Sequence, residues 1–181
     1  MWDGQIKVIT GIRRAGKSTL LFDLFYNYLI DNGIYKENII TLQLDKRKDA
    51  KYRNPIVLAE FVEKQIRMHT ENFYLFIDEI QFCYSVPDPD NAGFVITIYD
   101  MLNELKDYKN LDVYVTGSNS KMLSKDISTE FRGRSSQIHV YPLSFAEYND
   151  AVGGDKRDNF DRYMIYGGLP YILHLKTEEQ Y

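Results

Sequence analysis

The chain has 181 residues, of which 44% are hydrophobic and 27% charged, a balance typical of a folded soluble domain and not of a disordered chain. Its 22 Lys and Arg against 26 Asp and Glu give a net charge of −4, which argues against a surface that coats nucleic acid, although a local basic patch would fit. The sequence contains no signal peptide, no apolar run near the roughly 18 residues of a membrane span and a single cysteine, so we expect a cytoplasmic protein without internal disulfides.

Short apolar runs alternate with segments of helical periodicity, a pattern typical of a parallel sheet flanked by helices. Strands are predicted over residues 6–10, 39–44, 73–77, 113–116 and 137–141. Helices are predicted from residue 17 to a glycine stop at residue 33, from the Asn-Pro pair at 54–55 through 66, and from 95 through 105. Residues 45–54 are charged and nearly free of aliphatic side chains, so we expect a mobile surface loop there, with a nucleic-acid contact as the minority alternative. Residues 85–93 contain prolines and are expected to form a second loop.

The alternation changes after residue 142. Ser144 and Glu147 have the spacing of a capping box, so a helix is expected to begin there. Another helix is expected before the Gly-Gly-Leu-Pro run at residues 167–170, and the sequence stops within what resembles an unfinished helix. We therefore predict a core over residues 1–142 and a helical extension over 143–181, the start of a further C-terminal region.

Residues 11–18 read Gly-Ile-Arg-Arg-Ala-Gly-Lys-Ser and match the phosphate-binding loop pattern G-x-x-x-x-G-K-[ST] between a predicted strand and a predicted helix. Glycines let consecutive N–H groups turn inward as an anion nest, and the following helix adds a positive field. Lys17 is predicted to reach the β- and γ-phosphates of a nucleotide, and the Ser18 hydroxyl to bind Mg²⁺. The predicted nucleotide-binding residues are Gly11, Ile12, Arg13, Arg14, Ala15, Gly16, Lys17, Ser18 and Thr19. The alternative is a glycine-rich turn with an incidental lysine. For Arg13 and Arg14, the alternative to a phosphate contact is a solvated side chain.

Asp78 and Glu79 follow the apolar run Phe-Tyr-Leu-Phe-Ile. Asp78 is predicted to hold Mg²⁺ through water at the carboxyl edge of the sheet, and Glu79 to polarise a water for attack on the γ-phosphate. The alternative is that the two acids only begin a polar loop. The adjacent glutamate favours hydrolysis over binding alone.

Two further pairs are candidates for catalysis. Ser118 or Asn119, after the fourth strand, could orient the attacking water or sense the γ-phosphate, and an N-cap is the alternative. Arg132 or Arg134, before the fifth strand, could serve as an arginine finger in cis or from a neighbouring subunit, and a surface ion pair is the alternative. The three histidines are scattered without the spacing of a zinc site.

Four segments occur in one order: ITGIRRAGKSTLL at 9–21, FIDEIQ at 76–81, VTGSNS at 115–120, and Gly133-Arg134 followed by YPLSFAEY at 141–148. Together they resemble AAA+-type prokaryotic P-loop ATPases of the additional-strand class, which often carry a C-terminal domain of unknown function. The resemblance covers about residues 6–170. It implies an α/β, three-layer fold with a parallel five-stranded sheet in the order 5-1-4-3-2 and helices on both faces. It also implies the roles given above for Asp78 and Glu79, a sensor at Ser118 or Asn119, and a finger at Arg134 or Arg132.

The expected function is therefore Mg²⁺-dependent ATP binding and hydrolysis, coupled to an unknown conformational task. The alternative is an ATP-dependent switch or scaffold with little turnover. A small-molecule kinase is disfavoured because no arginine-rich lid segment is found, and a GTPase because the guanine-reading N-K-x-D is missing. The expected partners are ATP, further copies of the chain that supply an arginine finger, and a protein or nucleic-acid client that the sequence does not identify.

Overall fold

The computed structural model of the chain describes residues 2–117, 129, 131 and 133–174. A parallel sheet is formed by β1 (Ile6–Thr10), β2 (Ile39–Gln43), β3 (Phe73–Asp78), β6 (Leu111–Thr116) and β7 (Ser135–His139). Their order across the sheet is β2-β3-β6-β1-β7, which is 5-1-4-3-2 when these strands alone are counted along the chain and read from the β7 edge. The predicted α/β fold class is confirmed. The structure also has two short strands that were not predicted, β4 (Val86–Pro87) and β5 (Val95–Ile96), which pair as a separate hairpin.

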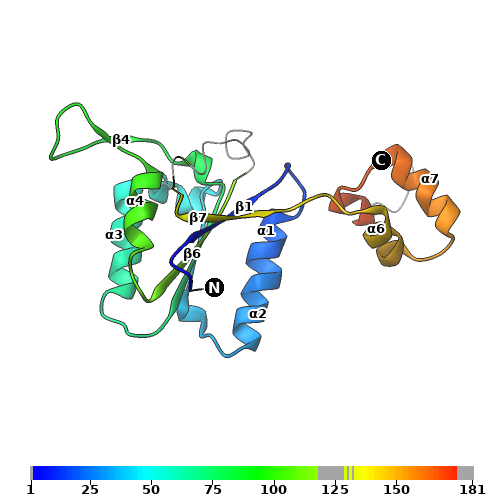
Figure 1. Cartoon of the computed structure of the whole chain (residues 1–181), viewed down its shortest axis with the longest axis horizontal. Coiled ribbons are helices and arrows are strands. Elements are labelled where there is room, and N and C mark those ends of the chain that lie inside the picture. Colours follow the sequence, from blue (N-terminus) through cyan, green and yellow to red (C-terminus); the bar gives the residue numbers. More distant parts are fainter. Residues whose placement is uncertain (1, 118–128, 130, 132, 175–181) are drawn as a thin grey trace.

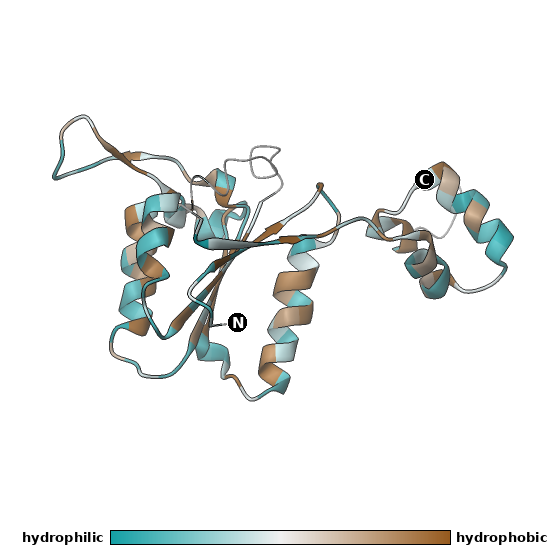
Figure 2. Cartoon of the chain, viewed as in Figure 1, coloured by the Kyte–Doolittle hydropathy of each residue, from teal (hydrophilic) through white to brown (hydrophobic). Residues whose placement is uncertain are grey.

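Helices cover both faces of the sheet (Figure 1). One face carries a continuous helical run made of α1 (Lys17–Thr19), a π-helical segment (Leu20–Phe25) and α2 (Tyr26–Asp31). The other face carries α3 (Pro55–Ile66) and α4 (Ile98–Leu105). Hydrophobic residues accordingly follow the strands and the helical run, whereas α7 (Lys156–Tyr166) is largely hydrophilic (Figure 2).

The central strand β3 explains why two cores form. Leu75 and Ile77 point into the cluster with α3 and α4, whereas Tyr74 and Phe76 point into the cluster with the helical run, as the alternation of a strand requires. Every residue of β3 is buried, as expected for a strand covered on both faces. This double burial holds the C-terminal end of β3 in a fixed place at the edge of the sheet.

Residues 45–54 are not the mobile surface loop that we expected. A 3₁₀ helix spans Arg47–Arg53, and Tyr52 is buried with its ring 4.6 Å from that of Phe61. The Asp49 carboxylate accepts the Gln43 N–H at 2.9 Å. The Arg53 Nε–H also donates to the Leu44 carbonyl at 2.7 Å, so several contacts attach this mostly charged segment to the core.

The helix predicted from residue 95 begins later, at Ile98. Thr97 and Asp100 form a capping box that closes the first turn, and Val95 lies in the hairpin instead. The helix at Pro55 begins as predicted, with Asn54 Oδ1 accepting the Ile56 N–H at 3.0 Å. Strand β7 lies two residues earlier than predicted, because its ladder with β1 runs from Ser135 to His139 and ends with β1 itself.

The residues after β7 form α6 (Phe145–Val152), α7 (Lys156–Tyr166) and a 3₁₀ segment, η6 (Pro170–His174). The capping box at the start of α6 is present as predicted. The Leu143 N–H donates to the Gly168 carbonyl at 2.7 Å, and a Cβ on Gly168 would lie 2.1 Å from the Leu143 carbonyl oxygen. Only glycine allows this approach, which places the end of the helical extension beside Leu143, where the extension begins. No helix in the described part of the chain has the length and hydrophobicity of a membrane span.

Candidate functional site

The loop between β1 and α1 has an unusual backbone. Gly11 has φ +144°, and a Cβ there would lie 2.2 Å from the Val140 carbonyl oxygen. Arg14 (φ +67°) and Gly16 (φ +101°) are also left-handed, and the Ala15 N–H donates to the Ile12 carbonyl at 3.2 Å. This backbone curls tightly, as an anion nest requires.

Lys17 is the first residue of α1 and is 5% exposed. Its ammonium group donates to the carbonyl oxygens of Gly11 and Ile12, at 3.0 Å each. Burial lowers the pKa of Lys17 below its ordinary value of 10.5, and the nearby carboxylates of Glu79 and Asp78 oppose that shift. A buried cation bound to loop carbonyls is suited to exchange these acceptors for phosphate oxygens.

Asp78 accepts hydrogen bonds from two hydroxyl groups of different elements. Ser18 Oγ donates to Asp78 Oδ2 at 2.9 Å, and Thr116 Oγ1 donates to Asp78 Oδ1. The pKa of Asp78 is nevertheless raised, first by burial and then by the charges of Glu79 and Asp45, against the effect of the two hydroxyls. Burial therefore disfavours the charged form of this carboxylate.

The oxygen atoms of Ser18 and Asp78 fit a Mg²⁺ ion, which prefers hard oxygen ligands and is usually held by one or two carboxylates together with waters and phosphates. No group of three or more His, Cys, Asp or Glu side chains within residues 2–117 and 133–174 could hold a metal by itself.

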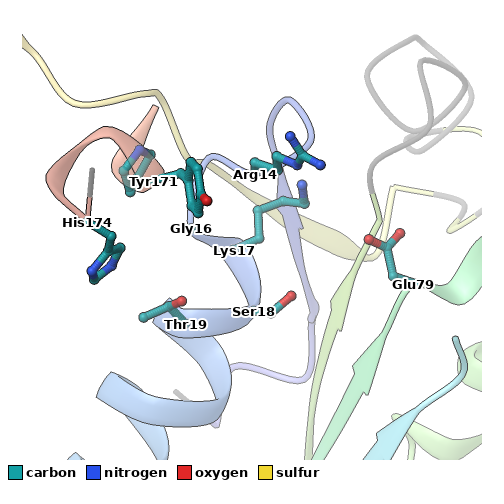
Figure 3. A pocket seen from close by; sticks show the side chains of 9 residues that line it. Arg14, Gly16, Lys17, Ser18, Thr19, Glu79, Tyr171 and His174 are labelled. Atoms are coloured by element: carbon teal, nitrogen blue, oxygen red, sulfur yellow. The ribbon is translucent and has the colours of Figure 1, made fainter. Parts of the chain in front are cut away.

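Glu79 has a left-handed backbone, with φ 57° and ψ 55°. Its N–H donates to Thr116 Oγ1 at 3.2 Å, and its carboxylate accepts a hydrogen bond from Gln81 Nε2. Non-glycine residues in this conformation are uncommon and gather at functional sites. The strained turn directs Glu79 across the cavity toward Lys17 and Ser18 (Figure 3).

These groups border a cavity of about 550 Å³, within the usual range for ligand sites. Its lining residues are Arg14, Gly16, Lys17, Ser18, Thr19 and Glu79 from the core, and Pro170, Tyr171 and His174 from η6. A second cavity of about 320 Å³ lies on the other side of Glu79 and is lined by Arg13, Asp45, Glu79, Gln81 and Phe82. Arg14 thus borders the first cavity and Arg13 the second.

Arg134, one of the two predicted candidates for an arginine finger, does not line this cavity. Arg134 directly precedes β7, and its carbonyl accepts the N–H of Ile6, the first residue of β1. It therefore lies at the N-terminal edge of the parallel sheet, opposite the loop that follows β1, and does not line the cavity of its own chain. The pKa of Asp107 is lowered by a hydrogen bond from Lys106 and, less strongly, by the charge of Arg134. Ser118, Asn119 and Arg132 lie outside the described residues.

Two parts of the site were missed in the sequence. Thr116 contacts both Asp78 and the Glu79 N–H, and its position at the end of a strand next to β3 is a signal that could have identified it. Tyr171 and His174 reach the cavity from η6, more than 150 positions after the loop, and no local pattern indicates that contact.

Known proteins resemble the chain in sequence and in fold. Residues 3–149 match the family described as "AAA domain". The chain is 32% identical over 173 residues to an uncharacterized protein of Haemophilus influenzae and 34% identical over 191 residues to the uncharacterized protein MJ1544 of Methanocaldococcus jannaschii. These alignments cover 93% and 96% of the chain but 40% and 37% of the relatives, so the chain spans less than half the length of either.

Among solved structures, the Walker-type ATPase PABY2304 of Pyrococcus abyssi superimposes with a TM-score of 0.56 at 15% identity. The superposition covers 93% of this chain and 60% of that one. At this identity the likeness concerns the fold.

Proposed function

The chain belongs to the AAA domain family, and from this premise we propose that it binds ATP with Mg²⁺ at residues 11–19 and hydrolyses the bond to the γ-phosphate. The observation that carries the proposal is the 2.9 Å hydrogen bond from Ser18 to Asp78, which joins the phosphate loop to the strand acid. That pair is the one which, in P-loop ATPases, holds the metal at the β- and γ-phosphates.

Binding of the triphosphate would use the loop backbone and Lys17. The curled segment from Gly11 to Gly16 supplies N–H donors, and the N-terminus of the helical run adds a favourable field. The Lys17 ammonium would move from the carbonyls of Gly11 and Ile12 to phosphate oxygens, where its charge is better compensated.

Ser18 and Asp78 would hold Mg²⁺, Ser18 directly and Asp78 through water. When bound, the ion neutralises charge on the phosphates and fixes their orientation. The raised pKa of Asp78 supports this role. Because burial disfavours the charged form of this carboxylate, a nearby cation would stabilise it more than it would an exposed carboxylate.

Glu79 would act as the general base. A water between Glu79 and the γ-phosphate attacks phosphorus, the bond to the β-phosphate oxygen breaks, and the proton of the water passes to the Glu79 carboxylate. Gln81 donates to the Glu79 carboxylate, and Thr116 accepts the Glu79 backbone N–H. These two contacts hold the base in place. Ser118 or Asn119 remains our proposal for the sensor of the γ-phosphate.

An arginine finger would come from a neighbouring copy of the chain. Arg134 is exposed at the sheet edge opposite its own cavity, so in this proposal it serves the site of another copy, with Arg132 as the alternative. A protein or nucleic-acid client, driven by the energy of hydrolysis, also remains a proposal.

The test is phosphate release from ATP, with and without Mg²⁺, by the unmodified protein, Lys17→Ala and the control Lys36→Ala. Lys36 is an exposed residue on the 3₁₀ turn before β2, at the opposite edge of the sheet. We expect Mg²⁺-dependent turnover that Lys17→Ala abolishes and Lys36→Ala preserves. Turnover that survives Lys17→Ala would contradict the proposal, and tight ATP binding without phosphate release would favour the switch or scaffold.

A further inference from the structure

The segment of residues 84–96, which contains β4 and β5, extends away from the rest of the chain as a hairpin (Figure 1). It follows the turn at Glu79 and leads into α4. Three of its large hydrophobic side chains are exposed: Tyr84 by 53%, Val95 by 59% and Phe94 by 70%. Figure 2 shows hydrophobic residues along the same segment. Exposed hydrophobic side chains that gather on one protruding element are typical of an interaction surface.

The hairpin segment is held at its base and closed at its tip. The Tyr84 N–H donates to the Arg53 carbonyl at 3.2 Å, which fixes the first strand to the core. The second strand ends at Thr97, the N-cap of α4. At the tip, Asp88 Oδ1 accepts the Asp90 N–H at 2.9 Å. The surface is therefore formed before a partner arrives, and binding to it costs less conformational entropy.

The pairing of the two strands decides which side chains face solvent. Pro87 pairs with Val95, and Val86 pairs with Ile96. Because paired residues share a face, Pro87 and Val95 form an exposed face, whereas Val86 and Ile96 form a half-buried one. Pro87 has no N–H for an added strand, so side chains are better suited than backbone pairing to carry a contact at β4.

The charge of the hairpin segment selects between the classes of partner. Residues 68–105 contain no Lys or Arg, and the charged residues of the segment are Asp88 and Asp90. Arg53 lies at the base, but its guanidinium group donates to the Leu44 carbonyl at 2.7 Å. Nucleic-acid binding depends on Lys and Arg contacts to phosphates, which this surface cannot supply. A polypeptide with hydrophobic and basic side chains is complementary to it in both respects.

We propose that the hairpin segment is the docking surface for a client polypeptide in which hydrophobic side chains are interspersed with Lys or Arg. Tyr84, Phe94 and Val95 contact the hydrophobic side chains of the client, and Asp90 contacts its basic ones. The inference rests on the proposed function only in calling this partner the client, because the docking itself requires no nucleotide.

The experiment measures the fluorescence anisotropy of three labelled probes with the full chain and without nucleotide. The probes are a short synthetic peptide of Leu and Lys spaced by Gly and Ser, the same peptide with Glu in place of Lys, and single-stranded oligothymidine. The unmodified protein should bind the basic peptide, more weakly as salt increases, and neither of the other probes. Phe94→Ser and Tyr84→Ser should each weaken that binding by roughly 5- to 30-fold, the usual cost of truncating an important aromatic interface residue. Asp90→Asn should weaken it by up to about 5-fold at low salt.

Tyr35→Ser is the matched control, because Tyr35 is 74% exposed and precedes β2, at the edge of the sheet opposite the end of β3 from which the hairpin segment leaves. It should bind the basic peptide as the unmodified protein does. Melting temperatures should show that all variants are folded, and sedimentation should show one oligomeric state for all of them.

Failure of the unmodified protein to bind the basic peptide would overturn the inference, and so would equal affinities of Phe94→Ser and Tyr35→Ser. Binding of oligothymidine that Phe94→Ser weakens would overturn it in favour of a nucleic-acid client. A change of oligomeric state in Phe94→Ser would overturn it in favour of a second copy of the chain. Each of these results leaves ATP hydrolysis at residues 11–19 intact, whereas absence of hydrolysis alone would refute the proposed function and leave the docking surface intact.

Discussion

Ser18 and Asp78 are separated by 60 positions in the sequence and are joined by a 2.9 Å hydrogen bond. Thr116 reaches the same carboxylate from the strand between β1 and β3. The carboxyl ends of adjacent parallel strands meet at one edge of a sheet, so the order of the strands alone brings these three residues together.

Asp78→Asn should raise the melting temperature of the metal-free protein at neutral pH. Burial is the largest cause of the raised pKa of Asp78, so any stability that the protonated acid contributes is present below the ordinary pKa of 3.8 and is lost as the pH rises through the raised value. Asparagine carries no charge to bury, and each kcal/mol gained would shift the melting temperature by about 2–4 °C. The same variant should lose the stabilisation that Mg²⁺ and nucleotide give together.

The control for that variant is Asp49→Asn. Asp49 is also buried, but its carboxylate has a charge partner in the Lys48 ammonium at 3.9 Å, so we expect this substitution to lower stability and leave the Mg²⁺ effect unchanged. Thermal denaturation with and without Mg²⁺ and nucleotide measures both variants. A metal-free Asp78→Asn protein that melts below the unmodified one would contradict the cost of burying this charge.

Glu79→Gln should bind ATP normally and release phosphate about 10²- to 10⁴-fold more slowly, the usual cost of removing a general base. The amide keeps the size of the side chain and cannot take the proton. Single-turnover phosphate release together with nucleotide binding separates the two effects, and Glu37→Gln on the exposed turn before β2 is the control. Unchanged turnover in Glu79→Gln would remove this residue from the mechanism.

Gly11→Ala should abolish nucleotide binding, because a Cβ would lie 2.2 Å from the Val140 carbonyl and push the loop out of shape. Gly33→Ala is a matched control. Gly33 also has a positive φ, +84°, but no heavy atom lies within 4 Å of its Cβ position. We expect the control to lose about 1–2 kcal/mol of stability from backbone strain alone and to keep its nucleotide affinity. Equal behaviour of the two variants in binding and melting experiments would rule out the close approach as the reason for glycine at position 11.

Thr116→Val should weaken the Mg²⁺ dependence of ATP binding. It removes the hydroxyl that donates to Asp78 and accepts the Glu79 N–H, and it should cost about 1–3 kcal/mol of stability. Thr10→Val is the control, since Thr10 is equally buried at the end of β1 but contacts His139 and Gln137. We expect both variants to lose stability in denaturant unfolding, and only Thr116→Val to lose Mg²⁺ dependence. A matching loss of that dependence in Thr10→Val would assign the effect to general destabilisation.

A mixture of Lys17→Ala and Arg134→Ala should regain turnover that neither variant has alone. One keeps an intact finger and the other an intact phosphate loop, so a mixed assembly joins the two at one interface. Loss of a finger costs roughly 10³- to 10⁵-fold, which leaves a wide range for recovery. Full activity of Arg134→Ala by itself would transfer the role to Arg132 or to no finger at all.

The fold was predictable where its signals are local. The phosphate loop, the apolar strand before Asp78 and the capping box at Ser144 each lie within a few consecutive residues, and the structure places each of them as expected. The errors concern contacts that join separate segments. Tyr52 joins a charged segment to the core through Phe61. Val95 pairs with Pro87 in a hairpin, whereas the prolines of residues 85–93 had led us to expect a loop.

The candidate site divides in the same way. A known loop motif and a strand-end acid were enough to predict that Lys17, Ser18 and Asp78 meet. Tyr171 could not be found from sequence, because its approach to the loop depends on how the whole extension returns past Gly168. No pattern of neighbouring residues predicts that approach.

The most direct test of the account is a crystal structure of the protein with Mg²⁺ and a non-hydrolysable ATP analogue. We predict triphosphate oxygens bound to the N–H groups of residues 11–19 and to Lys17, with Mg²⁺ on Ser18 Oγ and Asp78 linked to it through water. An empty cavity at saturating analogue, or a nucleotide bound away from Lys17 and Asp78, would contradict the central claim.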